Sequence, residues 1–348
     1  MTRVNEFGVE RYERTSVDEP YPPAQRDPRS THAPGTARPR IDAVCVGECM
    51  ALLVPEEAPP GHAPRFRAEV GGAEGNVAVH LARAGRRVEW HGPLGDDPFG
   101  DRIRERLTAS GVVCRSRIDP ARPTGLYMKH PGPEGTRMRY WRRGSAASAL
   151  GRDDAVAVRK SAPRLVHTTG ITAALSETAD ELVEELLTDT SPTTLRSFDV
   201  NHRPALHDTP GRRRRLLDLA RRADVVFCGL DEAQALWGIE TIAGLRALIP
   251  EPEWLVVKQG ATGATALRAG GSFFHPAPEV EVVEPVGAGD AFAAGFLHRL
   301  LDEAPPMECL AEGTALAGLV LGLEGDAPAP PPPPTSCDTD TGPSGRHH

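Results

Sequence analysis

The sequence predicts an α/β fold: a doubly wound, mostly parallel sheet with helices on both faces and a small β-sheet lid. The chain has 348 residues, 39% of them hydrophobic, which is enough for one large domain with a well-buried core. Short apolar runs alternate with longer amphipathic stretches over most of its length, and this alternation is typical of a parallel sheet covered by helices. One segment breaks the alternation with a hairpin pattern.

The strands of the main sheet are indicated by five short apolar runs. These runs are AVCVG, LVHTTG, RSFDVN, ADVVFCG and WLVVKQG. Between them lie stretches in which apolar residues recur with the period of a helix. These stretches cover residues 75–84, 100–110, 177–188, 211–222, 231–237 and 290–302. Strand and helix therefore alternate, which favours parallel strands.

The lid is indicated by residues 124–142, TGLYMKHPGPEGTRMRYWR. Two alternating segments flank a Pro-Gly-Pro-Glu-Gly turn there, which predicts a β-hairpin. Because side chains alternate along a strand, Tyr140 and Arg142 should lie on the same face. Together with residues 64–70, the hairpin would form a separate sheet, and we place the lid at about residues 48–70 and 112–142.

Both ends of the chain are predicted to be disordered. Residues 1–40 and the proline-rich residues 327–348 hold few large apolar side chains, so burial cannot offset the entropy of ordering. The folded domain would then cover residues 41–326.

Composition argues against several classes of protein. The net charge is −8 and no basic domain stands out, so we expect no nucleic-acid partner. No apolar stretch is long enough to span a membrane, and the first 40 residues lack the apolar core of a signal peptide. The six cysteines form no C-x-x-C pair and fit buried thiols, so we expect a cytoplasmic location.

The segment VEPVGAGDAFAAGF, residues 283–296, carries the main candidate site. Gly287, Ala288 and Gly289 can leave backbone N–H groups free at the N-terminus of a helix, which is the geometry of a phosphate site. Asp290 can accept a proton from an attacking hydroxyl, as the base of a phosphoryl transfer does. The alternative is a glycine turn in which Asp290 caps the helix.

Two other phosphate motifs are excluded. The chain contains no G-x-x-x-x-G-K-[ST], so it is not a P-loop protein. GAGDAF also lacks the third small residue of a dinucleotide fingerprint and lies late in the chain.

Two segments with polar or glycine residues would lie near the ends of strands. In VGGAEGNVAVHLARAG, residues 70–85, Gly72 would let a ligand lie against the backbone and Asn76 would face it; the alternative is a loop into a packed helix. In VVKQGATGA, residues 256–264, a glycine loop would border a nucleotide or form an ordinary turn.

A third segment, FDVNHRP, places Asp199, Asn201 and Arg203 directly after a buried strand. Ligands of parallel sheets gather at the carboxyl ends of strands. Arg203 would clamp a carboxylate or phosphate there, or pair with Asp199 in a structural salt bridge.

Taken in this order, GGAEGN, DVNHRP, VKQGATGA and PVGAGDAFAAG resemble the ribokinase (phosphofructokinase-B) family of sugar kinases. The resemblance covers residues 41–326 and implies an ATP-dependent kinase with a Rossmann-like core and a β-sheet lid. Within that family, the chain is similar to 2-keto-3-deoxygluconate kinases in the stretches GECMALLVPEE, TGLYMKH, RYWRRGSAAS and HTTGITAALS.

The resemblance implies a role for each matching residue. Asp290 would be the base, and Gly287, Ala288 and Gly289 the anion hole. The sugar acid would contact Gly72, Asn76, Tyr127, Tyr140, Arg142, Ile171, Arg203 and Asp326. ATP would contact Asn201, Lys258, Gly260, Gly263, Ala264 and Thr314. Glu232 would help to order Mg²⁺ through water. Activation by a monovalent cation and pairing of subunits through the lid are further features that the sequence leaves open.

Several positions depart from the family pattern. Gly229 replaces the Asn or Ser usual before Glu232, His207 replaces a common tryptophan, and Thr314 replaces an asparagine. The proline-rich tail stands where relatives continue into another helix. Two alternatives therefore stay open: a kinase of a neutral sugar such as fructose or ribose, and a kinase-like binding protein without turnover.

Overall fold

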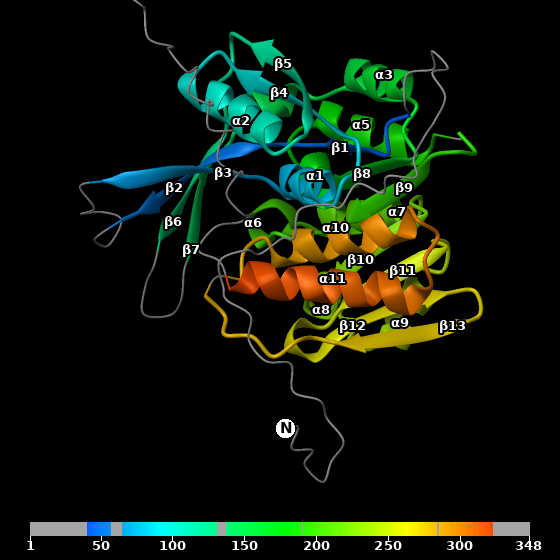
Figure 1. Ribbon diagram of the computed structural model, residues 1–348. Coiled ribbons are helices and arrows are strands. Elements are labelled where there is room, and N and C mark those ends of the chain that lie inside the picture. Colours follow the sequence, from blue (N-terminus) through cyan, green and yellow to red (C-terminus); the bar gives the residue numbers. More distant parts are fainter. Residues whose placement is uncertain (1–39, 57–64, 131–136, 190, 284, 323–348) are drawn as a thin grey trace, which may run out of the picture. The chain divides into compact units, whose positions relative to one another are not determined.

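A nine-stranded sheet forms the centre of the domain in the computed structural model, which describes residues 40–56, 65–130, 137–189, 191–283 and 285–322 (Figure 1). In spatial order its strands are β13 (Gly271–Pro276), β12 (Gly263–Arg268), β11 (Trp254–Lys258), β10 (Val225–Gly229), β9 (Leu195–Asp199), β8 (Leu165–Thr169), β1 (Ala43–Val46), β4 (Val88–Gly95) and β5 (Val113–Asp119). All neighbours from β11 to β5 are parallel, and β12 and β13 form an antiparallel edge. The predicted fold class is confirmed.

Helices cover both faces of this sheet. One face carries α1 (Ala73–Arg83), α10 (Ala288–Leu300) and α11 (Pro306–Leu321), which lie side by side in the foreground of Figure 1. The other carries α3 (Arg152–Ser161), α5 (Glu177–Leu187), α7 (Pro210–Ala220), α8 (Leu230–Trp237) and α9 (Ile242–Leu248). Phe227 and Trp254 point from the sheet toward Phe296 of α10, with ring centroids 5.6 Å apart in each pair. Such edge-on aromatic packing fixes α10, and with it the segment that precedes α10.

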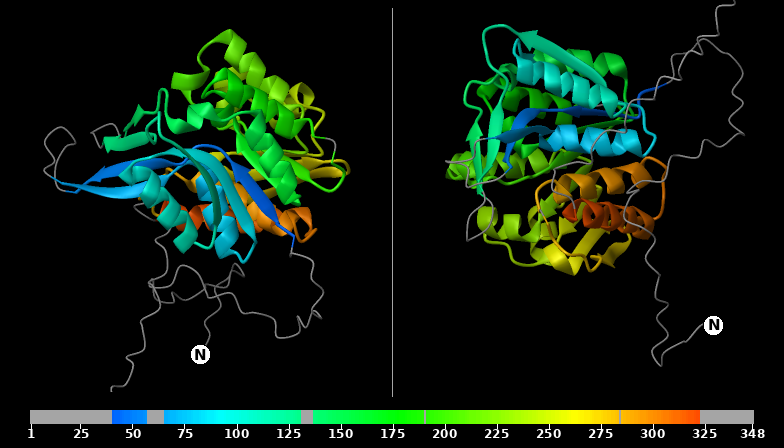
Figure 2. Two further views of the ribbon diagram at one scale, coloured as in Figure 1. Left: turned by 90° about the horizontal axis from the view of Figure 1, so that it is seen from above. Right: turned by 60° about the vertical axis from the view of Figure 1, so that its left-hand side comes forward.

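The lid is a separate four-stranded sheet beside the core (Figure 2). Its strands are, in spatial order, β3 (Phe66–Gly71), β2 (Met50–Pro55), β6 (Leu126–His130) and β7 (Arg137–Trp141). The predicted hairpin is confirmed, because β6 and β7 pair antiparallel; its turn, residues 131–136, lies outside the described residues. Met50, Leu52 and Tyr127 form a small buried core under this sheet.

The predicted lid was too long at residues 112–124. The structure places β5 at the edge of the nine-stranded sheet, parallel to β4 and linked to it by α2 (Pro98–Ala109). A strand, a crossover helix and a parallel strand form one compact unit, and α2 closes it by burying Ile103 and Leu107. The edge strand β5 leaves most of its residues exposed or half-buried, so its pattern resembles that of a lid strand.

The strand order reverses direction between β1 and β8. Ligands of doubly wound sheets bind at such a switch point, outside the carboxyl ends of the strands. The lid strand β2 leaves the core directly after β1, so the lid lies beside the same crevice.

The remaining predictions concern the two ends of the chain, membrane-spanning segments and the cysteines. The disordered segments predicted at residues 1–40 and 327–348 lie, apart from residue 40, outside the described residues. Within the described part, no helix is long and apolar enough to cross a membrane. Cys45, Cys49, Cys228 and Cys309 are buried free thiols there.

Candidate active site

One cavity of about 1180 Å³ lies at the carboxyl ends of the core strands and extends under the lid. It collects almost every candidate residue of the sequence. Its lining includes Gly72, Asn76, Tyr127, Tyr140, Arg142, Ile171, Asn201, Arg203, Glu232, Lys258, Gly260, Gly263, Ala264, Gly287, Ala288, Gly289, Asp290 and Thr314. Asp326 lies outside the described residues. Residues separated by more than 200 positions therefore share one site.

The loop before α10 is built to receive an anion. Gly287 is the N-cap of α10 with a φ of 85°, a left-handed conformation that favours glycine. Within the part of the chain that the structure describes, no side chain caps this helix. Ala288 donates its N–H weakly to the Pro285 carbonyl oxygen, at 3.4 Å, and the N–H groups that follow in the first turn of α10 are left for a ligand. The helix dipole adds positive potential at this end. Asp290 lies in the first turn of α10 and is not its N-cap, so the alternative of a simple capping aspartate is wrong.

Two amides orient the carboxylate of Asp290. Asn76, in the first turn of α1, donates from Nδ2 to Asp290 Oδ2 at 2.9 Å, and Asn201 donates to Oδ1 at 3.4 Å. Burial raises the pKa of Asp290 to about 7; the negative charge of Asp199 acts in the same direction, and the Asn76 hydrogen bond, Arg203 and Lys258 oppose it. A carboxylate with a pKa near neutrality is suited to take up a proton during a reaction.

Because the pKa of Asp290 is raised, the stability of the folded state should depend on pH. The Asp290 carboxyl binds a proton more tightly in the folded chain, where its pKa is about 7 and the ordinary value is 3.8. The folded state therefore loses stability as pH rises between these values, and the whole cost is present above pH 7. The shift corresponds to at most about 4 kcal/mol, and contact with solvent in the cavity reduces this to about 1–2 kcal/mol.

We therefore expect Asp290→Asn to melt at a higher temperature than the wild-type protein at pH 8, with the difference vanishing toward pH 4. Thermal unfolding followed by circular dichroism across this range measures it. Asp208→Asn, at an exposed aspartate, should show no such pH-dependent gain. A stabilisation of Asp290→Asn that is equal at pH 5 and pH 8 would contradict the raised pKa.

The lid end of the cavity combines aromatic and charged groups. The rings of Tyr127 and Tyr140 stack at a centroid distance of 5.6 Å, and the guanidinium of Arg142 lies 5.7 Å from the centre of the Tyr140 ring. Arg142 Nη2 forms an ion pair with Glu48, and Ser145 donates to the other oxygen of Glu48 at 2.5 Å. Arg142 lines the cavity, and its Nε is buried with no hydrogen-bond partner among the described residues, so Glu48 does not use all of its donors.

Glu48 was not predicted from the sequence. It follows β1 at the point where the chain passes from the core into the lid, and only 2% of its surface is exposed. A buried carboxylate needs a cationic partner, and here the partner comes from the far end of the lid. The acid in the GECM stretch was the available signal, but nothing local indicated its pairing.

A second buried acid, Glu74, joins α1 to the loop after β8. Thr169 and Thr172 donate to Glu74 Oε1 at 2.7 and 2.6 Å, and burial raises the pKa of Glu74. Gly47 makes room for this side chain, because a Cβ there would lie 2.2 Å from the Glu74 carboxyl carbon. Glu74 thus fixes the helix that carries Asn76 against the helix α4 (Gly170–Ala173) that carries Ile171.

Arg203 lies at the mouth of the cavity and is exposed. Among the described residues its side chain donates only to the carbonyl of His202, at 2.9 Å, so the predicted alternative of a salt bridge with Asp199 is wrong. The backbone N–H of Arg203 donates to His207 Nδ1 at 3.0 Å, and His207 Nε2 lies 3.1 Å from the Gly170 carbonyl oxygen. Burial lowers the pKa of His207 to about 4, so a neutral ring accepts this hydrogen bond and fixes the backbone, but not the side chain, of Arg203.

The opposite end of the cavity is bordered by β11, β12 and α11. A short turn, Gly260–Thr262, links the strands, with φ values of 57° at Gly260 and 133° at Gly263. Thr314 of α11 lies under this end, with its hydroxyl 2.9 Å from His275 Nδ1. Pro278, Val280 and Val282 add an apolar wall, which the sequence did not indicate. Glycine turns beside an apolar wall are suited to a flat base and its phosphates.

Glu232, the candidate magnesium residue, folds back on its own helix. Its carboxylate accepts from the backbone N–H groups of Gly229 and His202 at 2.6 and 2.7 Å. The described residues contain no cluster of three metal-ligating side chains. Mg²⁺ usually keeps several waters and binds through one or two carboxylates and phosphates. Each oxygen of Glu232 accepts one backbone N–H, so this carboxylate fits contact with the ion through water.

Comparison with known proteins identifies the family. The sequence pattern described as pfkB family carbohydrate kinase matches residues 40–332. The chain belongs to this family. As a carbohydrate kinase, it transfers a phosphoryl group from ATP to a sugar hydroxyl.

Individual relatives cover most of the chain. It is 36% identical over 301 residues to a 2-dehydro-3-deoxygluconokinase of Thermoproteus tenax, with 83% of this chain and 91% of the relative covered. It is 33% identical over 294 residues to a 2-dehydro-3-deoxygalactonokinase of Haloferax volcanii, with 82% and 92% covered. The crystal structure of a PfkB protein from Polaromonas sp. JS666 superposes with a TM-score of 0.72 at 34% identity, covering 80% of this chain and 94% of that chain.

Proposed function

We propose that this kinase phosphorylates the terminal hydroxyl of 2-keto-3-deoxygluconate (2-dehydro-3-deoxygluconate), with Asp290 as the base. The observation that carries the proposal is the placement of Arg142, which lines the cavity under the lid and is held there by Glu48. A guanidinium in that place suits the carboxylate of a sugar acid, because charge-assisted, forked hydrogen bonds give both affinity and orientation. The names of the relatives from Thermoproteus tenax and Haloferax volcanii point to the same class of substrate.

The reacting end of the sugar would then lie at Asp290. With its carboxylate held at the lid end and supported by Arg203 at the mouth, an extended keto-deoxy acid directs its last hydroxyl toward the loop before α10. Asp290, oriented by Asn76 and Asn201, takes the hydroxyl proton as the oxygen attacks the γ-phosphorus. The N–H groups of Gly287, Ala288 and Gly289 hold the phosphoryl oxygens as charge develops on them. Closure of the lid excludes water.

ATP would lie along the glycine turns of β11 and β12, with Asn201 and Lys258 near its phosphates and Thr314 near its base. Mg²⁺ would neutralise the phosphates, and Glu232 would hold it through water. Gly229 does not disable this carboxylate, because the contact to Glu232 comes from the backbone N–H of residue 229.

The proposal is tested by measuring ADP release with ATP, Mg²⁺ and four sugars in parallel. These are 2-keto-3-deoxygluconate, its C4 epimer 2-keto-3-deoxygalactonate, fructose and ribose. We expect turnover with the keto-deoxy acids and a kcat/KM at least about 10²-fold higher than with either neutral sugar, since a neutral sugar cannot form the charge-assisted contact to Arg142.

Two results would overturn the proposal. Turnover of fructose or ribose alone would assign the lid arginine to another role. Binding of sugar acid without ADP release would favour the binding protein without turnover.

A further inference from the structure

Besides the Arg142–Glu48 pair at the lid, a group of charged residues centred on Asp199 lies near Asp290. Asp199 ends β9 and is buried; both of its oxygens accept from Lys258 Nζ, at 2.9 and 3.1 Å. Its Oδ1 also accepts from the backbone N–H of Asn201 at 3.0 Å. Asn201 has a φ of 44°, a left-handed conformation that an aspartate two residues earlier stabilises. Asp199 therefore fixes both Lys258 and the amide that reaches Asp290.

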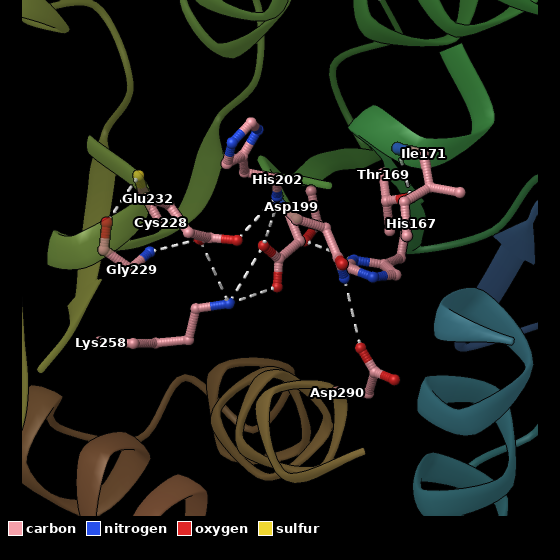
Figure 3. A network of polar contacts seen from close by, with 12 residues as sticks. His167, Thr169, Ile171, Asp199, His202, Cys228, Gly229, Glu232, Lys258 and Asp290 are labelled. Atoms are coloured by element: carbon pink, nitrogen blue, oxygen red, sulfur yellow. Dashed lines mark hydrogen bonds and ion pairs between the residues drawn. The ribbon is translucent and has the colours of Figure 1, made fainter. Parts of the chain in front are cut away.

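Lys258 lies at the anion loop as well as beside Asp199. It ends β11, which is separated from β9 by β10, so its side chain crosses the carboxyl end of the sheet to reach Asp199 (Figure 3). A methyl group built on Gly289 would lie 3.6 Å from Lys258 Nζ. The ammonium also lies 4.0 Å from Glu232 Oε2. It thus stands between two acids and the second glycine of the loop, on the cavity wall.

The position of Lys258 indicates a more specific role than contact with the nucleotide. We propose that Lys258 is a second catalytic residue, whose ammonium neutralises the phosphoryl group during transfer, and that Asp199 is the residue that positions it. The inference rests on the proposed kinase reaction. In that step the sugar oxygen forms a bond to the γ-phosphorus, its proton passes to Asp290, and the bond from the γ-phosphorus to the bridging oxygen breaks to release ADP.

In the proposed step, positive charge is needed beside the transferring phosphoryl group. Charge spreads over the transferring phosphoryl oxygens in the transition state, so a cation fixed beside them stabilises that state more than the ground state. An unrestrained lysine would lose rotamer freedom when it engages phosphate. The ion pair with buried Asp199 has already restricted this freedom, and the burial of Asp199 keeps the pair from being exchanged for water contacts.

The first measurement is the steady-state kinetics of Lys258→Met beside Lys160→Met, whose lysine is exposed on α3. We expect Lys258→Met to lower kcat by about 10²–10³-fold, as loss of one transition-state donor does, with KM for the sugar acid changed by less than about threefold. Lys160→Met should behave as the wild-type protein. A raised KM for ATP with unchanged kcat would mean that Lys258 only binds the nucleotide, and would overturn the catalytic role.

The second measurement needs no sugar, so it separates this inference from the proposed function. Asp290 is faced by the charges of Asp199, Arg203 and Lys258. Removal of Lys258 should raise the pKa of Asp290, and removal of Asp199 should lower it, each by about one unit. The pKa of Asp290 in the folded chain is read from the pH above which the gain in melting temperature caused by Asp290→Asn no longer increases. It is measured in the wild-type, Lys258→Met and Asp199→Asn backgrounds.

Asp224→Asn is the control for an ordinary broken ion pair. Asp224 accepts from Arg196 at the opposite end of β9 and β10, so its loss should lower the melting temperature without moving the pH of that transition. Opposite shifts in Lys258→Met and Asp199→Asn support the assigned positions even if no tested sugar is phosphorylated, a result that would defeat only the proposed function. Shifts that are absent, or equal in direction, would overturn the placement of the pair.

Discussion

Asp290→Asn is expected to lower kcat with the sugar acid by about 10²–10⁴-fold, the range of a lost general base. The asparagine keeps the shape of the side chain and can still contact Asn76, but it cannot take a proton at neutral pH. ADP release in a coupled assay measures the effect, and affinity for ADP should change little.

Because the same substitution is expected to stabilise the fold above pH 7, a loss of activity cannot be ascribed to unfolding. Asp208→Asn, at an exposed aspartate outside the cavity, serves as the matched control and should keep full activity. If Asp290→Asn retained more than about a tenth of the wild-type kcat, another group would be the base.

Arg142→Gln is expected to lower kcat/KM for the keto-deoxy acid by about 30- to 10³-fold, most of it through KM, because truncation of one partner of a buried charge pair costs about 2–5 kcal/mol. The substrate carboxylate would lose its forked partner under the lid. Any turnover of neutral sugars should be affected far less. Steady-state kinetics with both classes of sugar measure the difference.

Two further variants isolate the charge of Arg142 from its structural role. Arg143→Gln changes the exposed neighbouring arginine and should be neutral. Arg142→Gln leaves Glu48 buried without its cation, so its melting temperature should fall. Glu48→Gln combined with Arg142→Gln should restore stability but not affinity. An equal loss of activity on acid and neutral sugars would show that Arg142 shapes the lid and does not select the acid.

The two arginines proposed to hold the substrate differ in how the fold supports them. Arg142 is held by Glu48 across the junction of core and lid, whereas Arg203 makes one side-chain contact, to the neighbouring carbonyl, among the described residues. A buried partner fixes Arg142 before the ligand arrives, so its geometry costs little at binding. Arg203 is exposed and must be ordered by the ligand.

The sequence by itself determined the fold class, five strands of the main sheet and the loop before α10 as the candidate site. Strands such as WLVVKQG and the loop at Gly287 are recognisable because their patterns are local: a run of buried side chains, or glycines directly before an apolar helix. Asp290 could be singled out for the same reason, since its loop and its helix are adjacent in the chain.

Tertiary structure alone decided which charges meet. Asp199 was expected to pair, if at all, with Arg203 four residues later, but the sheet order brings Lys258 across β10 to it. Glu48 meets Arg142 because the lid returns to the point where it leaves the core, and β5 joins the main sheet because α2 returns it beside β4. Sequence periodicity records the burial of each residue, whereas the partner of a buried charge depends on strands that are distant in the chain.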